Sequence, residues 1–271
     1  MATRIVTAVL LIPAVLAAVF YVGAGPLSLG ILVLVAFLLA KFEAESLIPS
    51  RVAFESLWID VILLFAAAPI VVNYGAKGML VVLCVLMTVS VLYGIRALRL
   101  SLFGKFGTGL LLGPWVSAPL WSIAIFAADR HYYANEVWNF RHPLLLLLIP
   151  IWVGDTAAIF VGKALGKTPL APRISPKKTW EGALGNFVGC LAGAWATGAY
   201  CGIPLAPSLA CGLVAGTLGQ AGDLFESALK RSVGRKDSGA LLPGHGGILD
   251  RIDSLLFSAI PIVLILAFWV R

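Results

Sequence analysis

About nine apolar stretches divide this chain of 271 residues, and most of them are long enough to cross a lipid bilayer as a helix. They cover residues 5–22, 27–40, 59–73, 78–94, 108–128, 143–162, 183–201, 207–229 and 254–270. Only 12% of the residues are charged, against 60% hydrophobic, which excludes an ordinary soluble domain. The sequence therefore predicts an all-α fold, a polytopic integral membrane protein with about nine transmembrane helices.

The basic residues between these stretches predict the orientation of the chain. With nine crossings, 16 of the 20 Lys and Arg residues fall on one side, which the positive-inside rule assigns to the cytoplasm. We therefore expect a cytoplasmic N-terminus. The net charge of +7 then belongs to one membrane face and does not indicate a nucleic-acid partner. The four cysteines have no CxxC spacing, so zinc binding is not expected.

The polar and charged residues that could carry a function are concentrated in the C-terminal half of the chain. Residues 1–105 are expected to be mainly structural transmembrane helices, and residues 106–271 a transmembrane catalytic region. This region carries two cytoplasmic motif loops, 155–182 and 223–253. In the N-terminal part, a connection with charges of both signs is expected to be an ordinary solvated loop; it contains Lys41, Glu43, Glu45, Arg51, Glu55 and Asp60.

The first motif loop contains the run Ser175-Pro176-Lys177-Lys178-Thr179, before a helix expected to begin near Trp180 and Glu181. Open amides at a helix start and two adjacent lysines favour a bound anion. The alternative is a basic loop that only enforces topology. Asp155 follows the apolar run 144–153, where a carboxylate costs roughly 2.5–3.5 kcal/mol at membrane depth. It is therefore expected to face the protein interior or a wet cavity.

The second motif loop includes a polar run of 27 residues, from 227 to 253. Asp223, Glu226 and Ser227 are spaced to share one face of a helix. Asp250 and Asp253 are three residues apart and open the last helix, where carboxylates suit the helix dipole. Acids that converge from two helix ends form an oxygen-rich site that suits Mg²⁺. The alternative is salt bridging of these acids with Lys230, Arg231, Arg235 and Arg251.

Between the two groups of acids, the segment Pro243-Gly-His-Gly-Gly247 can bring backbone amides close to phosphate. Mg²⁺ beside a cluster of cations at a membrane face implies phosphoryl or nucleotidyl transfer to a lipid, in which the protein mainly positions groups and stabilises charge. No Ser–His–Asp arrangement is visible in the sequence. A lipid phosphate, already ionised near neutral pH, is therefore expected to act as the nucleophile itself.

Residues 227–253 resemble the signature of the phosphatidate cytidylyltransferases, or CDP-diacylglycerol synthases: S-x-L-K-R, four residues, K-D-x-G, then L-P-x-H-G-G-x-x-D-R-x-D. The first loop is similar to the family's second block, D-T/S-x-A ending in S-P-K-K-T-x-E-G, with departures at Ala158, Lys163 and Asn186. The resemblance implies the reaction CTP + phosphatidate → CDP-diacylglycerol + pyrophosphate. It also implies Mg²⁺, alone or with a second cation, in a homodimeric enzyme of the bacterial-type inner membrane, with a cytoplasmic active site.

The patterns and the resemblance together assign expected roles. Catalysis is assigned to Asp223, Asp250, Lys178 and Arg251. Mg²⁺ is expected to be held by Asp223, Asp250 and Asp253. Substrate phosphates are expected to bind Ser175, Lys177, Thr179, Lys230, Arg231, Lys236, His245, Gly246 and Gly247. Supporting roles are assigned to Asp155, Lys167, Glu181, Glu226 and Asp237.

Other functions fit part of the pattern. A related enzyme would use another lipid phosphate, such as an isoprenoid or ether lipid, or would transfer the terminal phosphate of CTP to a lipid alcohol. An anion or lipid transporter also needs basic cavities, but it does not need clustered acids. A CDP-alcohol phosphotransferase is disfavoured because its D-G-x-x-A-R…D-x-x-x-D pattern is absent.

Overall fold

Helices make up most of the residues that the computed structural model describes, namely 2–21, 27–47, 78, 116–124, 126, 142–241 and 246–269. Close contacts divide the chain into two compact units. The first unit consists of Met1–Asn139 and Asp237–Leu249, and the second of Phe140–Lys236 and Asp250–Arg271. The expected helices at 59–73 and, beyond its first residue, 78–94 lie outside the described residues.

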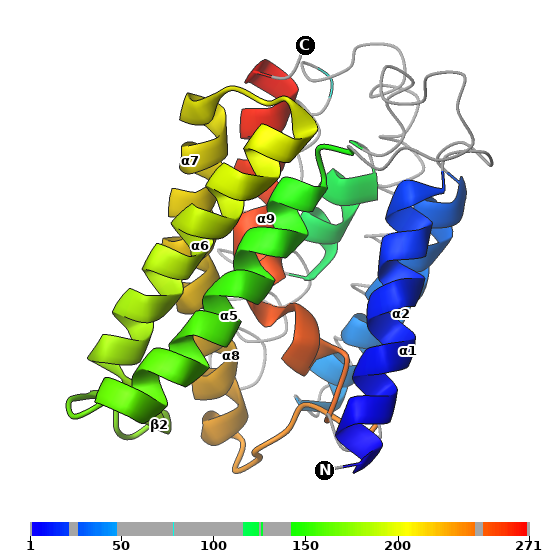
Figure 1. The fold of residues 1–271 in the computed structure, drawn as a ribbon. Coiled ribbons are helices and arrows are strands. Elements are labelled where there is room, and N and C mark those ends of the chain that lie inside the picture. The colour runs from blue at the N-terminus through cyan, green and yellow to red at the C-terminus, as the bar shows by residue number, and fades with distance from the viewer. Residues whose placement is uncertain are drawn as a thin grey trace, which may run out of the picture. The chain divides into compact units, whose positions relative to one another are not determined.

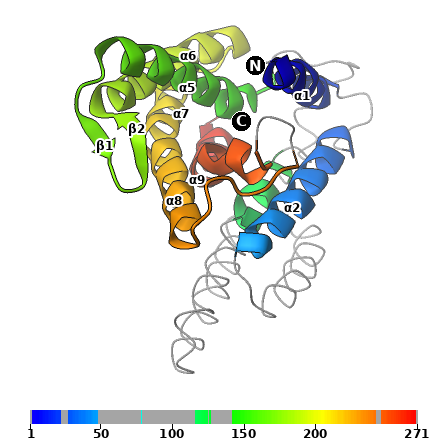
Figure 2. The ribbon, with the colours of Figure 1, turned by 90° about the horizontal axis from the view of Figure 1, so that it is seen from below.

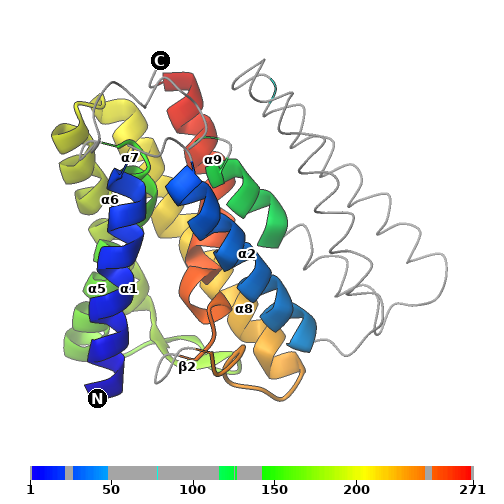
Figure 3. The ribbon, with the colours of Figure 1, turned by 90° about the vertical axis from the view of Figure 1, so that its right-hand side faces the viewer.

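In the first unit, helices α1 (Ala2–Phe20) and α2 (Leu27–Leu47) follow the first two apolar stretches (Figure 3). The Ser28 hydroxyl donates to the carbonyl of Tyr21 at 3.0 Å, which ties the start of α2 to the end of α1. Residues 116–124 are also helical, and the Trp121 ring lies 5.0 Å from that of Phe37. The described part of the expected helix at 108–128 is therefore helical.

One expectation about the first unit is wrong. The charged connection that begins at Lys41 was expected to be a solvated loop, but α2 continues to Leu47. Lys41 and Glu43 are both buried within this helix. The helix continues because apolar residues still recur beyond them, and Ala44 and Leu47 are also buried.

In the second unit, α5 (Leu145–Leu165) and α6 (Trp180–Cys201) lie side by side (Figure 1). They are antiparallel and pack through glycines of α6. A Cβ at Gly185 would lie 2.7 Å from the Cβ of Val161, whereas one at Gly189 would lie 2.8 Å from that of Ala157. Small residues at such spacing allow two helix backbones to approach closely within a membrane.

The chain turns between α5 and α6 through an antiparallel hairpin of β1 (Pro169–Ala171) and β2 (Ser175–Thr179). In Figure 2 this hairpin lies beside α8. The all-α prediction is wrong for this short segment, and the expected first loop begins too early, because α5 includes Asp155 and ends at Leu165. A single carboxylate does not interrupt helical hydrogen bonds, and α5 ends only where Gly166 takes an extended conformation with ψ of 119°.

The last part of the second unit is a long helical run followed by α9 (Leu249–Trp269). The run consists of α7 (Leu205–Val214), the π-helical turn Ala215–Gly219 and α8 (Gln220–Ser232), so it covers and extends the apolar stretch 207–229. Figure 3 shows α8 beside α9. They approach each other closely at Gly222, where a Cβ would lie 2.6 Å from the carbonyl oxygen of Asp253.

Two helices in the described part of the chain, α5 and α9, are long and apolar enough to cross a membrane. The expected starts of α6 and α9 are confirmed: α6 begins at Trp180, and α9 begins at Leu249 with Asp250 in its first turn. The fold is thus mostly helical, and the charged residues of both motif loops lie at or near helix ends.

Candidate active site

The two motif loops meet where β2 approaches α8. Lys178 on β2 forms an ion pair with Asp223 on α8. The two side chains are 29% and 33% exposed, so water screens this pair in part. The Ser227 hydroxyl donates to Oδ1 of Asp223 at 3.4 Å, which confirms that these two residues share one helix face.

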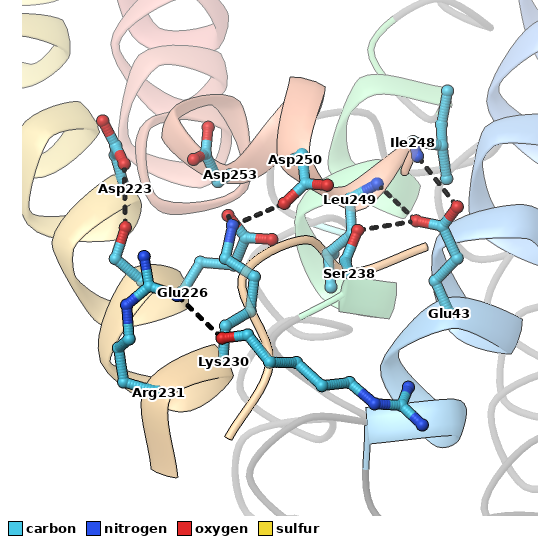
Figure 4. A network of polar contacts seen from close by, with 12 residues as sticks. Glu43, Asp223, Glu226, Lys230, Arg231, Ser238, Ile248, Leu249, Asp250 and Asp253 are labelled. Atoms are coloured by element: carbon cyan, nitrogen blue, oxygen red, sulfur yellow. Dashed lines mark hydrogen bonds and ion pairs between the residues drawn. The ribbon is translucent and has the colours of Figure 1, made fainter. Parts of the chain in front are cut away.

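A second ion pair joins α8 to α9. Lys230 is buried, and its ammonium donates to Oε2 of Glu226 at 3.0 Å and to the carboxylate of Asp250 (Figure 4). Burial alone lowers the pKa of Lys230, but its hydrogen bonds to Asp250 and Glu226 outweigh this effect and raise the pKa above its ordinary value. The salt bridging that the sequence left open is therefore present for Asp250.

Glu226 is fully buried beside this pair. No donor in the described residues reaches its Oε1 atom, but the Glu226 carboxyl group shares a side-chain hydrogen bond with Asp253. Glu226 thus lies between Lys230 and Asp253 within the candidate site, and its supporting role stays a prediction.

Asp155 and Asp253 lie near the Lys178–Asp223 pair. The charges of Asp223, Lys178 and Arg251 all act on Asp155, and the charges of Asp223 and Asp155 act on Asp253. The side-chain amide of Asn186 donates to Oδ1 of Asp155 at 3.1 Å. The structure thus brings α5, β2, α8 and α9 together around acids and cations from both motif loops.

These acids do not form the expected set of three metal ligands. Within the described ranges, no three His, Cys, Asp or Glu side chains lie close enough together to hold a metal ion. Instead, Lys178 and Lys230 neutralise Asp223 and Asp250. Mg²⁺ is usually held by one or two carboxylates together with substrate phosphates, so the oxygen donors here have the right chemistry for it. The magnesium site stays a prediction.

Several expected phosphate ligands make hydrogen bonds within the protein. Thr179 caps α6, where its hydroxyl accepts a hydrogen bond from the Gly182 amide at 3.2 Å. Arg231 donates from Nε to the carbonyl of Ile174 at 3.3 Å and from Nη1 to that of Arg235 at 2.8 Å. These two residues therefore shape the loops around the site, whatever they contribute to substrate binding.

Glu181 holds the turn before the hairpin. Its carboxylate accepts hydrogen bonds from the amide of Thr168 at 3.2 Å and from the Thr168 hydroxyl at 3.0 Å. Hydrogen bonds from its own amide, and from those of Lys167 and Thr168, hold the pKa of Glu181 below its ordinary value. A structural role at the first motif loop is thereby assigned to Glu181.

The remaining candidates are placed as follows. The exposed ones are Lys167, Lys177, Lys236, Asp237 and Arg251, and Ser175 is half-buried at the start of β2. Gly246 and Gly247 belong to the first unit, and His245 lies outside the described residues.

Sequence reasoning missed two residues. Asn186 was noted only as a departure from the family pattern, yet it holds Asp155. Glu43 was assigned to a solvated loop, yet it is buried and accepts a hydrogen bond from the Ser238 hydroxyl at 3.0 Å. The apolar pattern that continues to Leu47 was the available signal that Glu43 lies inside a packed helix.

A model of the cytidylyltransferase family matches residues 2–269. The phosphatidate cytidylyltransferase of Brucella suis is 40% identical over 159 residues, which cover 55% of this chain and 58% of the relative. That of Bacillus subtilis is 46% identical over 140 residues, 49% of this chain and 52% of the relative.

A chloroplastic relative is also similar. Phosphatidate cytidylyltransferase 4 of Arabidopsis thaliana is 50% identical over 174 residues, which cover 58% of this chain and 43% of the relative. In each of these three comparisons, the chain spans about half the length of the curated relative that it matches.

Proposed function

The chain belongs to the cytidylyltransferase family, and we propose that it transfers the cytidylyl group of CTP to phosphatidate, forming CDP-diacylglycerol and pyrophosphate. The observation that carries this proposal is the meeting of the two motif loops through the ion pair between Lys178 and Asp223, together with the ion pair between Lys230 and Asp250 within the second loop. The names of the similar proteins support the same substrates.

The proposed reaction joins two phosphate groups. A non-bridging oxygen of phosphatidate attacks the α-phosphorus of CTP and forms a new P–O bond. The bond from the α-phosphorus to the oxygen that bridges to the β-phosphorus breaks, and pyrophosphate leaves with that electron pair. The lipid phosphate is already ionised, so the attack needs no general base. Direct transfer predicts sequential kinetics and inversion at the α-phosphorus of a chiral phosphorothioate analogue of CTP.

The cations of the site would bind and orient the reacting phosphates. Lys178 on β2 and Arg251 on α9 both act on Asp155. Two cations that come from different elements would suit two anionic phosphates held side by side. Phosphate oxygens would compete with Asp223 and Asp250 for the two lysine ammonium groups. The exposed Lys177 and Lys236 would add positive charge that attracts the substrate phosphates.

Mg²⁺ is the proposed cofactor, either alone or together with a second cation. Asp223 and Asp250 would hold it, with Asp253 as the third candidate. When bound, it would neutralise negative charge on the CTP phosphates and on the departing pyrophosphate. Release of these acids from Lys178 and Lys230 would accompany the binding of nucleotide and metal.

The proposed site of action is the cytoplasmic face of a bacterial-type inner membrane, with the protein as a homodimer. The apolar helices α5 and α9 support membrane insertion, and the distribution of Lys and Arg supports the orientation. Cysteine-accessibility labelling should place residues 163–181 and 230–250 on the side opposite 129–142. Finding all three segments on one side would contradict this topology, and the mass of the protein in detergent would test the dimer.

The deciding experiment is an assay of the purified protein in detergent with CTP, Mg²⁺ and phosphatidate. Release of pyrophosphate together with CDP-diacylglycerol is the expected result. An isoprenoid phosphate in place of phosphatidate tests another lipid phosphate, and diacylglycerol with γ-labelled CTP tests a lipid kinase. If only the isoprenoid phosphate or only diacylglycerol is turned over, that lipid is the substrate in place of phosphatidate. If none of the three lipids is turned over, the proposed activity is wrong.

A further inference from the structure

Glu43 of α2 binds both ends of the segment 238–249 in the first unit. Its Oε2 accepts hydrogen bonds from the Ser238 hydroxyl at 3.0 Å and from the Leu249 amide at 2.9 Å. Its Oε1 accepts one from the Ile248 amide at 3.0 Å. Figure 4 shows these contacts converging on one carboxylate, from residues about 200 positions away in the sequence.

The buried position of Glu43 is compensated by these three donors. An isolated buried carboxylate would be strongly unfavourable, whereas one that accepts several hydrogen bonds is stabilised. Two of the donors are the amides at the start of α9, which have no partner within the helix. A negative charge at this end of the helix also suits its dipole. Glu43 therefore acts as a cap for α9 that another helix supplies.

The close packing around Glu43 also explains why two positions of the segment are glycine. A Cβ at Gly239 would lie 2.7 Å from Oε1 of Glu43. A Cβ at Gly247 would collide with the side chains of both Glu43 and Ser238. Neither glycine has a positive φ, in contrast to Gly246 with φ of 80°. Crowding by the Glu43 side chain, which its hydrogen bonds hold in place, thus favours glycine at 239 and 247, whereas backbone conformation favours it at 246.

We propose that Glu43 is a positioning residue for the transfer reaction. It fixes the first amides of α9, and Asp250 follows Leu249 directly in the chain and in the same helix. Holding this helix start sets where the Asp250 carboxylate lies and how segment 238–249 enters the helix. The catalytic part of this inference rests on the proposed function, whereas the capping part stands on the contacts alone.

The first test changes the charge or the length of the Glu43 side chain and measures the enzyme kinetics. Glu43→Gln keeps the shape but leaves only one acceptor oxygen and brings an NH₂ donor toward amides that also donate. We expect kcat to fall at least about tenfold, with the KM for CTP changed less than twofold, because misplacement of a catalytic group affects the chemical step. Glu43→Asp, which keeps the charge, should recover part of kcat. Phe42→Ala, beside Glu43 but exposed, is the control and should leave both parameters unchanged.

Hydrogen exchange provides a readout that does not depend on activity. The amides of Ile248 and Leu249 should exchange faster in the Glu43→Gln protein than in the parent, while peptides from α5 and α6 remain as protected as before. If the parent protein has no turnover, the proposed function fails, but these amides still test the cap. Unchanged exchange would overturn the inference. A lower melting temperature with unchanged kcat would also overturn the positioning role.

A double-mutant cycle separates crowding from phosphate binding at Gly247. Gly247→Ala should lower the melting temperature in the parent and lower it much less in a Glu43→Ser background, because the shorter side chain leaves room for the new methyl group. Additive shifts in melting temperature would contradict this explanation of the glycine. Equal loss of turnover in both backgrounds, with no shift in melting temperature, would assign Gly247 to phosphate binding and contradict the crowding argument.

Discussion

Lys230 and Asp250 form a nearly buried ion pair that joins α8 to the first turn of α9, with side-chain exposures of 10% and 6%. The two residues are 20 positions apart, at opposite ends of the second motif loop. Glu226 accepts a hydrogen bond from the same ammonium one helical turn earlier. One lysine therefore binds acids from two helices and holds them at the site.

Removing the charge of Lys230 is expected to destabilise the protein. Lys230→Met would leave Asp250 and Glu226 without their cation, and breaking a buried pair typically costs about 3–5 kcal/mol. The melting temperature in detergent should fall clearly. Lys163→Met, an exposed lysine on α5, is the control and should change it little. A melting temperature equal to that of the parent would show that the pair does not contribute to stability.

Asp223→Asn should separate activity from stability. The Lys178–Asp223 pair is about a third exposed, so its loss should cost only about 0–1 kcal/mol. Turnover should nevertheless fall by about 100-fold or more, because the carboxylate is proposed to hold Mg²⁺. The measurements are pyrophosphate release at saturating Mg²⁺ and the melting temperature of the same sample. Turnover close to that of the parent would remove Asp223 from the proposed metal site.

Gly189→Ala is expected to disturb the packing of α5 against α6. The added methyl group would lie 2.8 Å from the Cβ of Ala157 and 3.0 Å from the Cα of Gly154, which cannot move without the backbone. Overpacking of this kind typically costs about 1–3 kcal/mol, seen as a lower melting temperature. Gly30→Ala on α2 is the matched control, because a Cβ there would meet nothing within 4 Å. Equal melting temperatures for the two variants would contradict this close packing.

The turn before the hairpin should loosen in acid. The pKa of Glu181 is lowered in the folded protein, so its contribution is present above the ordinary value of 4.5 and is lost as the pH falls through the folded-state pKa. Exchange of the Thr168 amide, corrected for its intrinsic rate, should therefore accelerate below about pH 4.5. In the Glu181→Gln protein, the exchange rate of this amide should show no such increase at low pH. An increase of equal size in both proteins would mean that another group titrates.

Local patterns in the sequence determined the helices and their starts. Continuous apolar runs can satisfy their backbone groups in a membrane only as helices, and α5, α6 and α9 follow such runs. The start of α6 was predictable from the run that ends at Thr179, and so was the shared face of Asp223 and Ser227. These features depend on residues within about one helical turn, so the sequence alone displays them.

Tertiary structure decided which charges meet. Lys178 pairs with Asp223, and Glu43 binds Leu249 from 206 residues away, although no spacing rule relates either pair. Which charged residues pair depends on where helices approach each other closely, as they do at Gly222 beside Asp253. It also depends on burial, because a buried carboxylate must find its donors wherever the fold places them. The hydrogen-bond partners of Glu43 could therefore be recognised only from the contacts between α2 and the segment 238–249.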